Sequence, residues 1–335
     1  MYSWNKKEIK KDIEKLKIIT PKNNKDIYDI DYCINMLYKL LNNEGSNENN
    51  LYEENEEYKE LRFYNNIINP ILNKYLNKQS KKENYKTIFN TKKQILTITK
   101  ETINNINPNW YNLLLPLFHN SNILNYKHNN KNIFYFIDYI NKIFISLDKN
   151  NNIEDYIYPI HEYFHALTII LNPNYLYNIE YEFLSILGEL IISHEMKQKN
   201  HFQKEFIKTE LNSYSYILEL IKAIILKRCV INSNVKPKNK INYIHKNTRL
   251  SKDFIINLYD TSLSYSYSTV ISYFLAIELF EIYKLDKEKC IYICESIIQD
   301  PNTLETKLSK NNINLLENDN KYIKTLKKEY VKYNL

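Results

Sequence analysis

The sequence predicts a mainly α-helical protein with a small β element near the middle of the chain. Apolar residues recur at helical spacing over most of its 335 residues, whereas residues 132–148 are dense in the β-branched and aromatic residues that favour strands. With 44% hydrophobic and 25% charged residues, the composition is that of a globular protein, and the chain is long enough to bury a large core. We therefore expect a folded protein built mostly of packed helices.

The first 125 residues are expected to form a helical N-terminal region. Apolar periodicity predicts its helices over residues 5–20, 27–43, 58–77, 84–106 and 109–117. Residues 42–57 are rich in Asn and Glu and include Gly45, so we expect them to form a linker or a flexible loop.

Residues 126–335 are expected to form a second region, which carries the candidate functional residues. It begins with the strand signal at 132–148, which we interpret as a hairpin or a short edge sheet, and a turn follows at 148–152. A loop is predicted over 232–247. Helices are predicted over 154–171, 178–197, 202–231, 251–283 and 286–298, with one more short helix at the C-terminal end.

The composition also excludes several classes of protein. The chain has only 2 glycines, too few for a Gly-rich phosphate-binding loop, because such loops need positive φ angles and close approach of the backbone to the phosphate. The net charge of +7 comes from Lys dispersed among acidic residues, so no nucleic-acid partner is expected. No window of 18 apolar residues occurs, and no apolar stretch follows the charged N-terminal residues, so we expect a cytoplasmic protein without a membrane partner.

The strongest chemical motif is the five-residue run from His161 to His165, in which Glu162 follows the first histidine. On a helix, the two histidines project from one face a turn apart, so both imidazoles can reach a single Zn²⁺, while Glu162 can reach a water molecule on that ion. The alternative is a pair of histidines packed in a satisfied core. The motif predicts a zinc site that needs a third protein ligand.

The next predicted helix offers carboxylates for that third ligand. Glu182 and Glu189 are seven residues apart, two helical turns, and therefore share one face, with Glu180 close by. An unpaired charge is costly to bury, and a metal with its histidines would remove that cost. The alternative is an amphipathic helix with a solvated acidic edge.

Together these segments resemble the thimet oligopeptidase and oligoendopeptidase F group of zinc metallopeptidases. The resemblance covers roughly residues 135–283. In chain order it rests on the strand at 143–147, an Asp six residues before the first motif histidine (Asp155), the motif from His161 to His165, the Glu-x-x-Ser-x-x-x-Glu pattern from Glu182 to Glu189, and the Tyr-x-Tyr-Ser-Thr stretch that contains Tyr265 and Tyr267.

The resemblance implies a zincin-like helical catalytic domain with its β element at the active-site cleft, and one Zn²⁺ per chain. It implies three metal ligands, which are His161, His165 and Glu182, and it makes Glu162 the general base that acts on a zinc-bound water. The resemblance further implies that the protein is a metalloendopeptidase or oligopeptidase of the gluzincin type.

The same resemblance implies supporting residues. Asp155 and Glu189 would orient the ligands, and either Tyr265 or Tyr267 would hydrogen-bond the oxyanion, although both tyrosines could instead belong to the core or the surface. His245, in the loop predicted over 232–247, is the candidate for the substrate-binding histidine of the family.

The sequence also departs from the family pattern. Phe164 stands where the family usually has Gly, no glycine follows Gly188, and His245 lies twenty residues before Tyr265. The chain is also shorter than typical members, so its substrate range and gating are expected to differ.

We therefore predict a zinc-dependent metallopeptidase that hydrolyses short or unfolded peptides. An extended peptide could pair with the strand at 143–147 through its main chain. Two alternatives remain open, a specialised protease that processes a leader or precursor peptide, and a non-catalytic peptide-binding scaffold with a relict motif. No oligomeric state is predicted.

Overall fold

The computed structural model describes residues 6–20, 61–75, 78–89, 91–119, 123–124, 133–137, 142–147, 151–231 and 263–333, together with isolated helical positions between 30 and 38. Contacts among residues divide the chain into two compact units. Unit 1 comprises Met1–Glu48 and Thr87–Leu176, and unit 2 comprises Asn49–Lys86 and Tyr177–Leu335. The boundary near residue 125 between an N-terminal and a catalytic region stays a prediction, as do the linker at 42–57 and the loop at 232–247, which lie outside the described residues.

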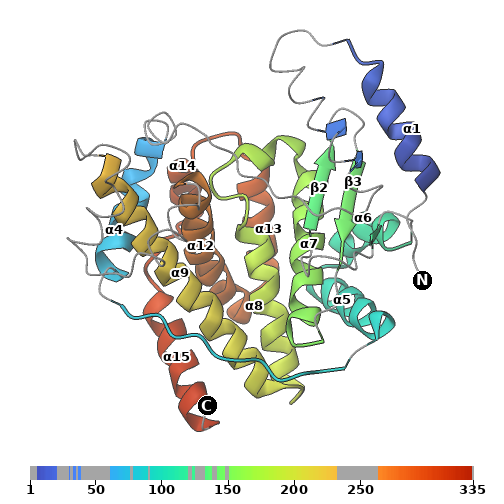
Figure 1. The fold of residues 1–335 in the computed structure, drawn as a ribbon. Helices are drawn as coiled ribbons and strands as arrows, with labels where there is room; N and C mark the ends of the chain where they lie inside the picture. The colour runs from blue at the N-terminus through green and yellow to red at the C-terminus, as the bar shows by residue number, and fades with distance from the viewer. Residues whose placement is uncertain are drawn as a thin grey trace. The chain divides into compact units, whose positions relative to one another are not determined.

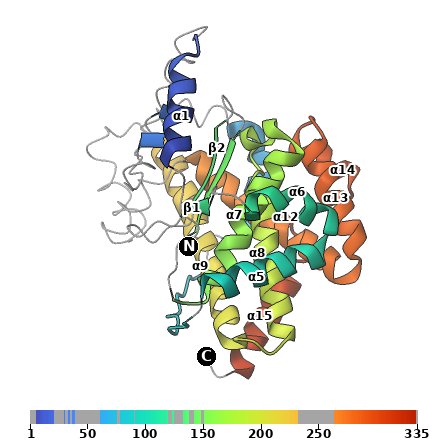
Figure 2. The ribbon, with the colours of Figure 1, turned by 90° about the vertical axis from the view of Figure 1, so that its right-hand side faces the viewer.

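Unit 1 is built around one central helix. Its helices are α1 (Lys6–Lys17), α5 (Lys92–Ile106), α6 (Pro108–His119) and α7 (Glu154–Leu171). Helix α7 contacts α5, α6 and two strands of a small sheet (Figure 1 and Figure 2). Aromatic side chains join these helices, since Trp110 meets Phe164 edge to face with ring centroids 5.8 Å apart, and Phe118 meets Tyr163 at 4.3 Å. Helix α7 is thus held firmly within its unit.

The sheet contains three described strands, β1 (Ile123–Leu124), β2 (Ile133–Ile137) and β3 (Lys142–Ser146), in the order β1-β3-β2. Strands β2 and β3 form the predicted hairpin and pair antiparallel, whereas the two-residue β1 was not predicted and pairs parallel to β3. Strand β3 therefore has neighbours on both sides at Ile145 and Ser146. The expectation that a peptide adds to this strand is wrong for these two residues, because their two edges are already paired.

A tight turn leads into α7, whose observed bounds agree with the predicted helix over 154–171. Asn151 adopts a φ of 55°, a left-handed conformation that Asn tolerates better than most residues. The Asp155 carboxylate accepts a hydrogen bond from the Asn151 N–H at 3.0 Å, and the Asn152 side chain accepts one from the Glu154 N–H at 2.8 Å. These bonds satisfy two main-chain N–H groups at the entry to α7 and hold the turn that precedes the helix.

After α7 come the short 3-10 helix η3 (Pro173–Tyr177) and the helices of unit 2. Unit 2 contains the 3-10 helix η1 (Arg62–Tyr64), α4 (Asn65–Tyr75), α8 (Phe183–Gln198), α9 (Gln203–Ile231), α12 (Leu263–Leu285), α13 (Lys287–Gln299), α14 (Leu304–Lys310) and α15 (Asp319–Lys332). The predicted short C-terminal helix is therefore two helices, α14 and α15.

Helix α12 is the central element of unit 2. It contacts α8, α9, α13 and α15 (Figure 1). Its side chains are buried along nearly all of its length. Two residue pairs show that α8 and α12 run parallel. Near the middle of both helices, the Glu189 charge acts on Tyr273. Further along both, the rings of His194 and Phe280 meet edge to face at 5.5 Å. The N-terminal ends of α8 and α12 therefore lie at the same end of the pair.

Residues 78–89 are extended, although residues 84–106 were predicted as one helix. Two side chains of α9 bind this segment through its main chain, since Asn212 pairs with both the N–H and the carbonyl of Glu83, and Ser215 does the same with Lys81. Helix α5 begins only at Lys92, after a capping box that joins Thr91 and Gln94. Tertiary contacts and a local cap thus override the apolar periodicity.

No described helix is both long enough and apolar enough to cross a membrane.

Candidate metal centre

His161 and His165 occupy successive turns of α7, as the motif predicts. Their Nε2 atoms lie 3.0 Å apart, and their ring centroids are 4.7 Å apart at an interplanar angle of 79°. His165 is buried and His161 is half-buried. The four-residue spacing on a helix therefore brings one ring nitrogen of each histidine to the same point.

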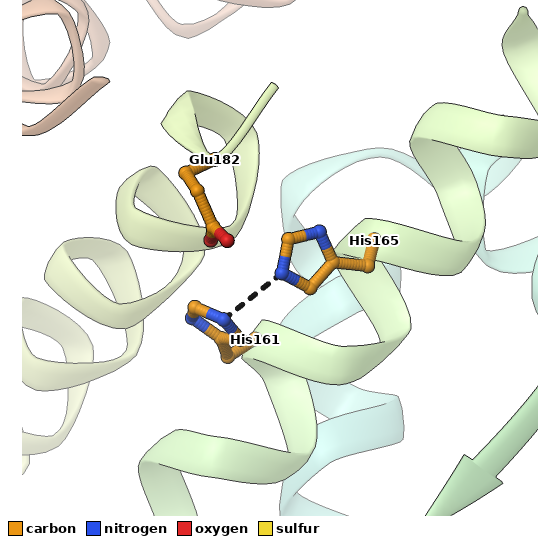
Figure 3. A group of neighbouring side chains, drawn as sticks. All are labelled: His161, His165 and Glu182. Atoms are coloured by element: carbon orange, nitrogen blue, oxygen red, sulfur yellow. Dashed lines mark hydrogen bonds between the residues drawn. The ribbon is translucent and has the colours of Figure 1, made fainter. Parts of the chain in front are cut away.

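Glu182 stands immediately before α8, at the N-cap position of that helix, and only 8% of it is exposed. Its carboxylate points toward both imidazoles in Figure 3, and the ligand atoms of the three residues all lie within 4.8 Å of one another. Within the described ranges, this is the group of His, Cys, Asp or Glu side chains whose geometry could hold a metal ion.

The donor set fits a zinc ion. Two nitrogen ligands at about 2.0–2.1 Å from a tetrahedral zinc lie about 3.3 Å from each other. The observed separation of 3.0 Å between the two Nε2 atoms is close to that value. Two nitrogens and one carboxylate are also the ligands of a catalytic zinc site, which keeps a fourth position for water or substrate.

Glu162 follows His161 on α7 and is 7% exposed. Helical geometry sets its side chain about 100° around the axis from His161. It directly follows the predicted ligand His161 in sequence. Its role stays a prediction.

Of the predicted orienting residues, Asp155 lies in the first turn of α7 and Glu189 lies near the middle of α8. Asp155 is 1% exposed and holds the turn before α7 through Asn151. Glu189 is half-buried on α8, and its charge contributes, after burial and the charge of Glu210, to raising the pKa of Tyr273. Their predicted contacts with the metal ligands stay predictions.

A buried ion pair supports the turn that carries Glu182. The Lys307 ammonium on α14 lies 2.8 Å from the Glu180 carboxylate, and both side chains are at most 3% exposed. Burial, and then the charge of Glu180, raise the pKa of Tyr64. Glu180 is two residues before Glu182, and the Phe183 N–H donates to the Glu180 carbonyl at 3.0 Å. The pair thus ties the start of α8 to a distant part of the chain.

The two candidate tyrosines have different surroundings. Tyr267 is fully buried, and its hydroxyl accepts from the Arg228 Nε at 2.7 Å and also from Nη2 of the same guanidinium. Arg228 in turn donates to Asn65 and Asn69 of α4, each at 2.6 Å. Tyr265, by contrast, is 42% exposed. The structure therefore places Tyr267 in a network that joins three helices and leaves Tyr265 at the surface of its unit.

Tyr216 of α9 is a further aromatic residue near Glu182, and the sequence did not single it out. Its hydroxyl donates to the Tyr265 hydroxyl at 3.4 Å, a long and weak hydrogen bond. Partial burial, the Tyr265 hydroxyl and the Glu182 carboxylate, in that order of size, raise the pKa of Tyr216. In a chain with 31 tyrosines, no local pattern marks this one.

His245, the predicted substrate-binding histidine, lies outside the described residues. Its role stays a prediction.

Comparison with known proteins identifies the fold of the chain. No family model matches the sequence, and no curated protein matches it. Solved structures of peptidases do match, and they show which fold the helices and the small sheet form. The chain has the helical fold of these peptidases, so the predicted mainly α fold and the structural resemblance are confirmed.

One match is a Bacillus anthracis strain Ames protein assigned as an oligoendopeptidase F, with a TM-score of 0.51 and 14% identity, over 92% of this chain and 62% of that chain. Another is a Chlamydophila abortus protein assigned as a peptidase, with a TM-score of 0.55 and 10% identity, over 92% of this chain and 60% of that one. PZ peptidase A, solved with an inhibitor, matches with a TM-score of 0.53 and 13% identity, over 88% of this chain and 62% of that one. The chain thus spans about three fifths of the length of these proteins.

Proposed function

We propose that the chain is a zinc-dependent metallopeptidase that hydrolyses peptide bonds in short or unfolded peptides. The observation that carries this proposal is the grouping of His161, His165 and Glu182 within 4.8 Å of one another. The helical fold, which is shared with solved peptidases, supports the same activity. We expect the substrates to be cytoplasmic peptides, with no nucleic acid or membrane taking part.

Three side chains would hold one zinc ion, namely His161, His165 and Glu182. When bound there, the ion would polarise the scissile carbonyl and lower the pKa of a water molecule towards about 7. Burial of His165 and Glu182 supports tight binding, since a charge held away from water interacts more strongly with its partners.

Glu162 would act on the proton of the attacking water and pass it to the leaving amine. Its low exposure of 7% keeps bulk water away from the carboxylate, and it directly follows the proposed ligand His161 on α7. The Tyr265 hydroxyl would donate a hydrogen bond to the carbonyl oxygen as negative charge develops on it.

Zinc content tests this proposal directly. We expect elemental analysis of the purified protein to find one zinc per chain, and the Glu182→Ala variant to bind zinc at least about 100-fold more weakly, because one of three protein ligands is lost. Glu305→Ala removes an exposed glutamate of α14 and is the matched control, with zinc content unchanged.

The same preparations are then assayed with a library of short peptides. Absence of zinc from the wild-type protein after zinc is added back would contradict the proposal and favour the peptide-binding scaffold with a relict motif. Zinc without cleavage of any peptide would contradict the activity while leaving the metal site in place.

A further inference from the structure

A buried lysine of α14 contacts the chain just before the proposed metal ligand Glu182. The Lys307 ammonium lies 2.8 Å from the Glu180 carboxylate, and the two side chains are 1% and 3% exposed. A lysine is almost never buried to this degree without an ionic partner, because its charge is costly to remove from water. Leu304 and Leu308, on the same face of α14, are buried as well. The packed face of α14 therefore holds the ammonium in a defined place.

The carboxylate that Lys307 binds belongs to the turn that leads into α8. The Phe183 N–H donates to the Glu180 carbonyl at 3.0 Å, which closes a hydrogen-bonded turn around Glu182. Phe183, at the other end of this turn, is fully buried. The main chain of Glu182 thus lies between two fixed points, the ion pair on one side and a packed aromatic ring on the other.

The Glu182 side chain does not cap α8, although it stands at the N-cap position. A capping side chain goes with an extended main chain. Glu182 instead has φ −76° and ψ −11°, and its side chain makes no capping hydrogen bond. Its carboxylate points toward His161 and His165 (Figure 3). A zinc ligand must lie within about 0.2 Å of its ordinary distance from the ion, so a small rotation of the turn would weaken metal binding.

We infer that Lys307 is a positioning residue for Glu182, holding the turn through Glu180 so that the Glu182 carboxylate meets the metal ion. The inference rests on the zinc site of the proposed function. Lys307 acts through Glu180 and does not need to touch the ion or the substrate. A charge-assisted hydrogen bond is directional, whereas apolar burial is not. The pair should therefore affect zinc affinity separately from stability.

Zinc dissociation constants of the full chain, measured by competition with a chromophoric chelator, test this inference. We expect Lys307→Met to bind zinc about 10-fold more weakly than the wild type, at the lower end of the range for residues that support metal ligands. Lys310→Met removes a lysine that is 52% exposed from the same helix and should bind zinc like the wild type. Unfolding curves of each variant give a temperature at which all of them are folded.

A double variant separates positioning from stability. Lys307→Met together with Glu180→Leu replaces both charges with apolar side chains, which should restore much of the stability that Lys307→Met loses. It should not restore zinc affinity, because the directional contact is still missing. Recovery of zinc affinity together with stability would show that the pair only stabilises the fold, and would overturn the inference.

A second ion pair controls for a general loss of stability. Lys74 of α4 lies 2.7 Å from Asp319 at the start of α15, and the Asp319 side chain is fully buried. Lys74→Met therefore leaves a buried carboxylate without its cation, as Lys307→Met does, in a pair that does not include residues 180–183. We expect its zinc dissociation constant to equal that of the wild type. An equal weakening in both lysine variants would also overturn the inference.

Failure of this inference is distinguishable from failure of the proposed function. If Lys307→Met binds zinc as tightly as the wild type while Glu182→Ala binds it weakly, Lys307 has no positioning role and the metal site stands. If the wild type binds no zinc, or Glu182→Ala binds it as tightly as the wild type, the proposed site itself is wrong, and the role of Lys307 is wrong with it.

Discussion

The histidines of α7 and the tyrosines of α12 come from equally short motifs, but only the two histidines come together in the fold. His161 and His165 are four residues apart, and their Nε2 atoms meet at 3.0 Å. Tyr265 and Tyr267 are two residues apart, and one is 42% exposed while the other is fully buried. Spacing by one turn brings side chains together, whereas spacing by two residues sends them to opposite faces.

Helical geometry alone can bring two side chains together, but it does not fix which neighbours each side chain contacts. On α7, helical geometry alone brings the two imidazoles together. On α12, the neighbouring helices decide, because Arg228 engages Tyr267 and Tyr216 engages Tyr265. Variants of the residues on α7 and on α12 test this difference directly.

The largest expected effect is on the α7 side. Glu162→Gln should lower kcat by about 10²- to 10⁴-fold, because the amide cannot accept the proton of the attacking water. Zinc content should stay at the wild-type value, since Glu162 is not one of the grouped ligands. Peptide turnover and elemental analysis of the same preparation check both expectations. Turnover near the wild-type rate would remove Glu162 from the reaction.

The next effect concerns the buried pair that supports Glu182. Lys307→Met should lower the free energy of unfolding by about 3–5 kcal/mol, because it leaves the Glu180 carboxylate buried without its cation. Denaturant unfolding measures this loss. Lys310→Met, which removes a lysine that is 52% exposed from the same helix, should cost about 0–1 kcal/mol.

A combined variant sharpens that experiment. Lys307→Met together with Glu180→Leu removes both charges, so we expect it to recover much of the lost stability. If the combined variant is as unstable as Lys307→Met alone, the packing of the lysine side chain, and not the ion pair, accounts for the loss.

On the α12 side, Tyr267→Phe should cost about 1.5–3 kcal/mol of unfolding free energy, because its hydroxyl accepts hydrogen bonds from the charged Arg228 guanidinium. We expect its kcat to stay within about 2-fold of the wild type. Tyr265→Phe should show the reverse pattern, with a large fall in kcat and little loss of stability. A fall in kcat for Tyr267→Phe at full stability would exchange the roles of the two tyrosines.

Much of the fold could be predicted because it depends on local sequence. The apolar pattern gave α7 its observed bounds, and the β-branched run at 132–148 gave the hairpin of β2 and β3. The non-helical course of residues 84–89 could not be predicted in this way, because two side chains of α9 bind its main chain: Glu205 accepts from the Lys86 N–H, and Lys208 donates to the Asn84 carbonyl. The two-residue strand β1 is too short to carry a periodic pattern.

In the candidate site, too, the residues that local spacing predicts differ from those that contacts between helices bring in. His161 and His165 follow from spacing on one helix, and the resemblance to known peptidases was needed to choose Glu182 among the nearby carboxylates. Tyr216 had no signal of its own, since its place beside Tyr265 arises only when α9 packs on α12. Contacts between helices thus set the limit of prediction for the site as they do for the fold.

The smallest expected effect is a pH dependence at the far end of α12. Glu278 is 3% exposed and accepts hydrogen bonds from the N–H and the side chain of Asn318, each at 2.8 Å. Burial raises the pKa of the Glu278 carboxyl above its ordinary value of 4.5, against the opposing effect of these hydrogen bonds. The carboxyl therefore binds its proton more tightly in the folded chain than in the unfolded chain.

A raised folded pKa contributes stability that is complete below pH 4.5 and is lost as the pH rises through the folded pKa. Glu278→Gln does not titrate, so the unfolding free energy of this variant minus that of the wild type should increase from about pH 4 to about pH 7. Urea unfolding of both proteins across this range measures the difference, with the exposed Glu305→Gln as the matched control. A difference that stays constant with pH would mean that the Asn318 hydrogen bonds fully offset the cost of burial.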